Sequence, residues 1–184
     1  MDKPIKTITE RLQEMHQNLL DKRIILIDGI LTESAGIQIE QIIKTLSQTE
    51  GKIDLYINSS GGNANVFLYI CSLLKETENI VSTICLEESC AGAAVLLSAG
   101  TKGMRFALAH SKISLNQTLW IKDENNANLE KAGKAIIDTK NNIISVLEEN
   151  TGLNKNRLEK LISSESVLSA KEAMEFGVID NLIG

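Results

Sequence analysis

Short apolar runs typical of buried strands alternate along this chain with segments whose apolar residues recur at helical spacing. Ile39, Ile42, Ile43 and Leu46 fall at i, i+3, i+4 and i+7, the stripe of an amphipathic helix, and the apolar run Ile53–Ile57 follows soon after. Strands that alternate with helices form βαβ units, which give a mainly parallel sheet with right-handed crossovers. The sequence therefore predicts the α/β fold class.

The same patterns divide the chain into elements. The predicted strands span residues 23–27, 53–57, 80–85, 105–108 and 112–115, with a short last strand at 178–180. The predicted helices cover residues 8–20, about 39–46, 63–74, 91–99, 127–150 and 169–177. Three boundaries carry a local signal: Asn63 opens a helix, Gly152 is placed as a left-handed C-cap, and Ser169 with Glu172 forms a capping box.

Length and charge narrow the class of protein. The chain has 184 residues, which predicts a single domain over residues 1–184, with residues 1–20 as an N-terminal segment and helix. A net charge of −5 gives no basic surface for nucleic acid or an anionic membrane, and no apolar stretch is long enough to span a bilayer. The start of the sequence lacks the apolar run of a signal peptide. We therefore expect no nucleic-acid or membrane partner.

Cysteine usage indicates the compartment. Cys71, Cys85 and Cys90 are odd in number and lack C-x-x-C spacing. We expect buried free thiols in a reducing compartment, most simply the cytoplasm, and neither a metal nor a cofactor.

Two predicted strand-to-helix junctions are the candidates for chemistry. The first is Y-I-N-S-S-G-G-N at residues 56–63, where two glycines allow a sharp turn and expose backbone N–H groups to an anion. The second runs from Ile84 to Gly103, where a strand enters a helix that begins with small residues, as in a nucleophile elbow. Taken singly, the first also fits an ordinary tight turn and the second a helix packed closely on its sheet.

Together, in this order and spacing, the junctions resemble the proteolytic subunits of the Clp protease (ClpP) family. The resemblance continues through T-I-C at 83–85, L-L-S-A-G-T-K-G-M-R-F at 96–106 and T-G at 151–152. It ends in S-E-S-V-L-S-A-K-E-A-M-E-F-G-V-I-D at 164–180, and it covers about residues 18–183 in all. It implies a ClpP/crotonase-type spiral of βαβ units with a protruding handle at about residues 117–150.

The resemblance also assigns site positions one by one. The family's nucleophilic serine falls on Ala91, its general-base histidine on Asn116 and its orienting aspartate on Glu165. Gly62 and Gly92 would supply the backbone donors of the oxyanion hole. The family consists of ATP-dependent serine endopeptidases, but alanine has no lone pair for attack and an amide does not accept a proton at neutral pH. The resemblance is therefore to a catalytically degenerate, ClpR-like member, and we expect no enzyme activity.

The family pattern is altered elsewhere too. The Gly-rich handle strand is replaced by T-L-W-I-K-D-E-N-N at 118–126, where Trp120 and Ile121 form either a new apolar contact or an anchor for the next helix. The resemblance implies a heptameric ring, single or stacked as a double ring, built from this chain alone or mixed with an active ClpP subunit. It also implies a docking face for an AAA+ ATPase, made by Tyr56, Leu86, Phe106 and Leu108.

Two other functions compete with an inactive ring subunit. One is an active serine-type or cysteine peptidase that uses Ser89, Cys90 or a partner's residues, with His16 and His110 as the only histidines of the chain. The other is a crotonase-like acyl-CoA binder, because that superfamily shares the spiral fold. The sequence shows no adenine contacts for the second, and the pattern at residues 164–180 favours the Clp family.

Overall fold

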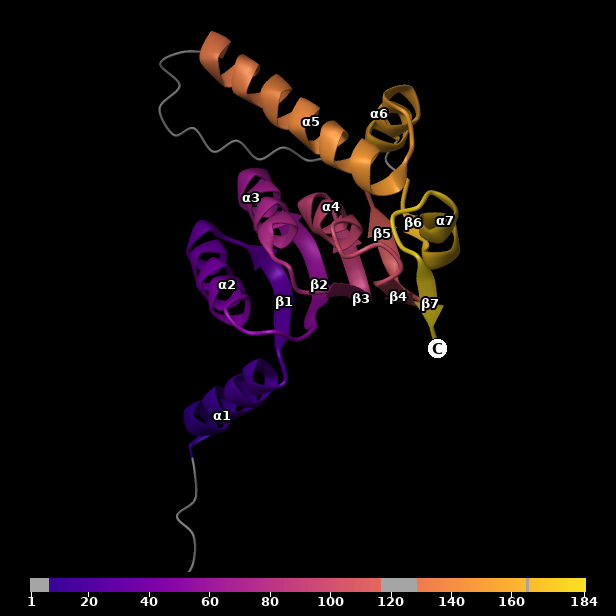
Figure 1. The fold of residues 1–184 in the computed structure, drawn as a ribbon. Coiled ribbons are helices and arrows are strands. Elements are labelled where there is room, and N and C mark those ends of the chain that lie inside the picture. Colours follow the sequence, from indigo (N-terminus) through magenta and orange to yellow (C-terminus); the bar gives the residue numbers. More distant parts are fainter. Residues whose placement is uncertain (1–6, 117–128, 165) are drawn as a thin grey trace, which may run out of the picture.

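The computed structural model describes residues 7–116, 129–164 and 166–184. Within these residues, helices and strands alternate as the sequence predicts (Figure 1). In chain order the elements are α1 (Ile8–Asp21), β1 (Ile24–Leu31), α2 (Glu33–Leu46), β2 (Ile53–Gly62), α3 (Ala64–Glu76), β3 (Val81–Cys90), α4 (Gly92–Ser98), β4 (Arg105–Leu108), β5 (Lys112–Ser114), α5 (Leu129–Thr151), α6 (Lys155–Ser163), β6 (Leu168–Ser169), α7 (Ala170–Glu175) and β7 (Asn181–Ile183).

A mainly parallel sheet is the centre of the fold. The order β1-β2-β3-β4-β7 is parallel throughout, β5 continues in parallel beside the end of β3, and β6 pairs antiparallel with β5. The α/β prediction is therefore confirmed. Alternate strand residues such as Ile53, Leu55 and Ile57 are fully buried, and they pack with Phe67 and Leu147 from the helices.

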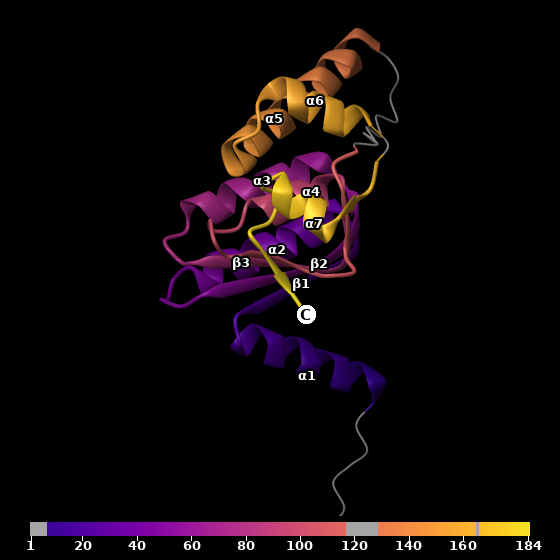
Figure 2. The ribbon, with the colours of Figure 1, turned by 90° about the vertical axis from the view of Figure 1, so that its right-hand side faces the viewer.

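The helices leave one sheet face open. Figure 2 shows α3, α4 and α5 on one side of the sheet and α1 on the other. On the open face, Leu26, Tyr56, Ile84 and Phe106 form one row across four strands, because each is the register partner of the next. Tyr56, Ile84 and Phe106 are half-buried and Leu26 is exposed. This face therefore offers apolar surface that the described residues do not cover.

Three predicted helix boundaries are confirmed. The Asn63 side chain accepts a hydrogen bond from the Asn65 N–H at the start of α3, and Gly152 follows α5 with a φ of 76°. Ser169 and Glu172 form both bonds of the capping box that begins α7. Local signals of this kind act within a few residues, so the sequence is enough to find them.

The two central strands are longer than predicted. β2 continues past Ile57 to Gly62 and β3 continues past Cys85 to Cys90. In the extension, Gly61 and Gly62 pair with Ile30 and Leu31 of β1 after a register shift. The glycine pair that the sequence suggests as a turn is therefore strand, because it finds its partners about thirty residues earlier in the chain.

The C-terminal strand lies three residues beyond its predicted place, at β7 rather than 178–180. Val178 and Ile179 are buried, and their N–H groups both donate to the Ala173 carbonyl, which ends α7. The chain's backbone bonds to the β4 backbone only from Asp180 onward, where the Asp180 N–H donates to the Arg105 carbonyl over 2.8 Å. The apolar pair is core packing and not a strand, and helix α6 was not predicted either.

A buried ion pair fastens this C-terminal region to the sheet. Arg105 of β4 donates from Nε to Asp180 over 2.8 Å and from Nη2 to the same carboxylate over 2.5 Å. Its Nη1 donates to the carbonyl groups of Ser98, Asn150 and Gly177. One guanidinium thus connects β4 with the ends of α4, α5 and α7.

Candidate functional site

A strained turn joins β3 to α4. Ala91, the single residue between them, has φ 52° and ψ −122°, a conformation that costs a non-glycine residue about 1–3 kcal/mol. Its N–H donates to the Ser114 carbonyl over 2.8 Å. A Cβ on the next residue, Gly92, would lie 2.3 Å from the Phe67 ring. The backbone therefore has the geometry of a nucleophile elbow, with a methyl group at its apex.

The glycine pair of β2 lies against this elbow. A Cβ on Gly62 would meet the Leu31 carbonyl oxygen at 2.3 Å, and one on Gly61 would be 3.2 Å from the Ala91 Cβ. The Gly61 N–H donates to Ser59 Oγ over 3.1 Å, and Ser59 Oγ donates to the Gly29 carbonyl over 2.5 Å. The glycines are needed for this close approach of β1, β2 and the elbow.

A cavity of about 390 Å³ opens at this point. It brings together Gly62, Ala91 and Asn116 of the predicted site. Gly92 is buried beneath the elbow and is not among the lining residues, and Glu165 lies outside the described residues. Trp120 and Ile121 of the predicted handle also lie outside them, and of that handle the structure describes α5 from residue 129 onward.

Part of the cavity wall is not marked in the sequence. Ile30 and Val167, which are 70% and 57% exposed, line it together with Ser60, and Ser114 lies beside the elbow. No local motif marks Ile30 or Val167, because they reach the cavity from β1 and from the segment before β6. Cys90, the candidate nucleophile of the alternative cysteine peptidase, also lines the cavity.

The cavity contains no imidazole among the residues that line it. His16 lies on α1 and borders a different cavity, and His110 is exposed in the turn between β4 and β5.

Cys90 is the one thiol at the cavity. It is half-buried and not buried as predicted, whereas Cys71 and Cys85 are buried, and all three are free. Burial raises the pKa of the Cys90 thiol, and the nearby carboxylate of Glu88 raises it further. Cys90 is therefore protonated at neutral pH, a poor state for nucleophilic attack.

The residues predicted to dock an ATPase lie on one face of the sheet. Tyr56 and Phe106 belong to the row described above, and Leu86 and Leu108 follow two residues later on β3 and β4, so they point to the same side. All four are half-buried. Asp54 lies at the margin of this face, where it forms an ion pair with Lys52 at 2.9 Å.

Two further kinds of feature are absent from the part of the chain that the structure describes. That part contains no cluster of three or more His, Cys, Asp or Glu side chains arranged to hold a metal. It likewise contains no helix with the length and apolar character needed to cross a bilayer.

The fold and the cavity define an α/β protein whose candidate site lies where parallel strands end beside a strained elbow. The chain belongs to the Clp protease family: the family model described as Clp protease matches residues 7–184, nearly the whole sequence. Proteins of this family generally form oligomeric rings. This match confirms, at the level of the family, the resemblance inferred from the sequence.

Proposed function

We propose that this chain is a proteolytically inactive, ClpR-like subunit that serves a structural or regulatory role in a Clp-type ring. The observation that carries the proposal is the pairing of Ala91 at the apex of the elbow with Asn116 across the same cavity. Acyl transfer needs a nucleophile and a base within hydrogen-bond reach of it. Neither position supplies one, and losing such a member costs roughly a millionfold in turnover in a comparable triad.

The retained elbow fits a scaffold role. Backbone strain persists only where the surrounding structure imposes it. Here the Ala91 N–H donates a hydrogen bond to the Ser114 carbonyl of β5, and the elbow packs on Gly61 and Phe67. The turn thus organises three neighbouring segments without any reactive side chain, which is what an inactive member of a ring needs from this site.

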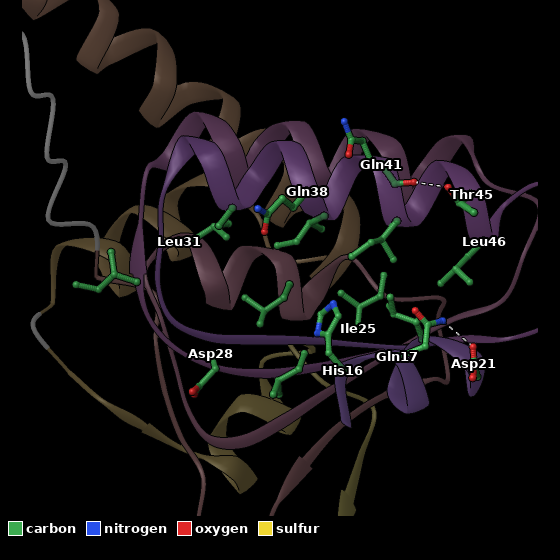
Figure 3. A pocket seen from close by; sticks show the side chains of 17 residues that line it. His16, Gln17, Asp21, Ile25, Asp28, Leu31, Gln38, Gln41, Thr45 and Leu46 are labelled. Atoms are coloured by element: carbon green, nitrogen blue, oxygen red, sulfur yellow. Dashed lines mark hydrogen bonds between the residues drawn. The ribbon is translucent and has the colours of Figure 1, made fainter. Parts of the chain in front are cut away.

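Assembly is supported by the surface around α1. Ile8, Leu12 and Met15 fall at i, i+4 and i+7 on this helix and are 78%, 59% and 61% exposed. An apolar groove of about 640 Å³, here called the α1 groove, lies between α1, β1 and α2 (Figure 3). One wall carries Ile25 and the other Leu46. A ridge and a groove on one molecule allow a head-to-tail contact between copies, which closes into a ring when the rotation permits.

The open sheet face supports an ATPase as a second partner. Half-buried apolar side chains at Tyr56, Leu86, Phe106 and Leu108 suit a partner that inserts apolar side chains. The charged pair of Lys52 and Asp54 at the margin would restrict which ATPase fits. The neighbouring subunits of the ring are copies of this chain or active ClpP subunits, and the expected compartment is the cytoplasm.

Turnover of fluorogenic peptides, measured together with native mass, tests this proposal. We expect the wild-type protein to form a ring-sized assembly, alone or with an active ClpP subunit, and to hydrolyse no peptide above the background without that subunit. Cys90→Ala is the control for the alternative of a cysteine peptidase. Turnover by the wild type that is lost in Cys90→Ala would establish that alternative, and a monomer under both conditions would rule out the ring role.

A further inference from the structure

The junction between α1 and β1 consists of Lys22 and Arg23. Arg23 has a φ of 60°, a left-handed conformation that is uncommon for a residue with a side chain. Its N–H donates to the Leu20 carbonyl over 2.8 Å and its carbonyl accepts from the Asp54 N–H over 3.0 Å. The chain therefore turns from the helix into the sheet at this one residue, whose backbone is bonded on both sides.

The Arg23 side chain is fixed as firmly as its backbone. Its Nη2 donates to the carbonyl groups of Leu46, Thr49 and Gly51 over 2.7, 3.2 and 3.1 Å. Its Nη1 donates to Thr49 Oγ1 over 2.8 Å and its Nε to the Lys52 carbonyl over 3.1 Å. Four of the five acceptors belong to the connection between α2 and β2, and the fifth is the carbonyl of Leu46, the last residue of α2. A Cβ on Gly51 would lie 2.9 Å from Nε, so the glycine leaves room for the guanidinium.

Among the described residues, α1 packs only at the surface of the domain. None of its residues is buried, and its Leu20, Gln17 and His16 only border the α1 groove. An isolated helix of 14 residues is marginal in water. The direction in which α1 leaves the domain is therefore governed by the residue at which it is attached.

We propose that Arg23 is a positioning residue that sets the direction of α1, so that the apolar stripe of Ile8, Leu12 and Met15 meets the α1 groove of the neighbouring ring subunit. This inference rests on the proposed assembly. The five hydrogen bonds of the guanidinium make the junction rigid. Because a rigid junction holds α1 in one orientation before association, less conformational entropy is lost when the subunits bind. If the junction were flexible, α1 would adopt many orientations, and in few of them would its apolar stripe face the groove.

Asn79 provides a matched control. Its Nδ2 donates to the same carbonyl groups of Leu46 and Thr49, over 3.4 and 3.1 Å, and its Oδ1 accepts from the Gly51 N–H. Asn79 thus stabilises the same connection from the other side but has no covalent link to α1. Asn79→Ala and Arg23→Ala both loosen this connection, and only the second frees the helix.

The first test measures assembly by native mass across a range of protein concentrations, with Tm measured in parallel. Arg23→Ala and Asn79→Ala are both expected to lower Tm. Only Arg23→Ala should weaken subunit association, by about tenfold or more, and Arg23→Lys should restore part of it because one donor group remains. Equal loss of association in the two alanine variants, or none in Arg23→Ala, would overturn the proposal.

The second test does not depend on assembly. Spin labels on Gln13→Cys of α1 and Ser72→Cys of α3 report the distance between helix and domain in the Cys90→Ala background, with labelled protein diluted into unlabelled protein. The distance distribution should be narrow, should broaden in Arg23→Ala and should stay narrow in Asn79→Ala. An unchanged distribution in Arg23→Ala would contradict the positioning role, whereas a monomeric wild type with the expected broadening would contradict only the assembly.

Discussion

The Ala91 N–H donates to the Ser114 carbonyl over 2.8 Å while Ala91 itself keeps a φ of 52°. The bond ties the elbow to β5, and the positive φ places backbone strain at the same residue. In an active hydrolase such a turn presents a nucleophile. In this chain it presents a methyl group, so the strain serves the packing of the cavity wall.

Ala91→Gly should therefore stabilise the protein. Glycine adopts the elbow conformation without a Cβ penalty, so we expect the free energy of unfolding to rise by about 1 kcal/mol, measured by urea denaturation. Ala94→Gly, in the buried interior of α4, is the control and should lower it by about the same amount. A loss of stability in Ala91→Gly would show that the methyl group contributes more packing than its conformation costs.

Ser89→Ala should also be stabilising. The Ser89 Oγ is buried and has no hydrogen-bond partner among the described residues. Removing an unsatisfied buried hydroxyl is expected to raise the free energy of unfolding by about 1 kcal/mol. Ser59→Ala is the matched control, because its Oγ bonds Gly29 and Gly61, and it should be destabilising. If both variants lose stability, Ser89 has a partner such as a buried water.

Asp180→Asn should weaken the attachment of the C-terminal region to β4, and the size of the effect should depend on pH. Burial by itself raises the pKa of Asp180, but the hydrogen bonds and charge of Arg105 outweigh it and hold the pKa below the ordinary 3.8. The carboxylate therefore stabilises the fold above pH 3.8, and this stabilisation is lost as the pH falls further through the lowered pKa. At pH 7 the substitution should cost about 3 kcal/mol, because it leaves a buried guanidinium unpaired.

Urea denaturation of the wild type and Asp180→Asn from pH 7 to pH 3 checks this expectation. Glu149→Gln, which breaks the exposed pair with Lys75, is the control and should change the free energy by less than about 1 kcal/mol. A wild-type advantage over Asp180→Asn that stays constant below pH 3.8 would contradict the lowered pKa.

The three thiols should react in a fixed order with iodoacetamide. Cys90 is half-buried at a cavity, so it should react first, slowly at neutral pH and faster as the pH rises, because its pKa is raised. Burial raises the pKa of Cys71 to about 12 and that of Cys85 to about 11, so both should react only on unfolding. Intact-mass measurement over time gives the order, and rapid labelling of Cys90 at pH 6 would reveal an activated thiol.

Much of the fold could be predicted from the sequence because its signals are local. Asn63, Gly152 and the capping box at Ser169 act within one helical turn, and the apolar stripes identify helices that pack on a sheet. The small residues after Cys90 suggest the elbow, but taken alone they also fit a helix packed closely on its sheet, and only the family resemblance favours the elbow.

What could not be predicted depends on contacts between distant segments. β2 reaches Gly62 only because Ile30 and Leu31 offer it a partner, and Val178 is core because the chain's backbone bonds to β4 only from Asp180 onward. Ile30 and Val167 enter the cavity from opposite ends of the chain. The five bonds of Arg23 cross 23 to 29 residues, a distance at which no spacing rule applies.

The central claim, that no nucleophile and general base meet at the cavity, is tested most directly with a fluorophosphonate probe and intact-mass measurement. We predict no adduct on the wild type or on Ala91→Ser alone, and an adduct at residue 91 in Ala91→Ser combined with Asn116→His. An adduct on the wild-type protein at any residue of the cavity would contradict the account.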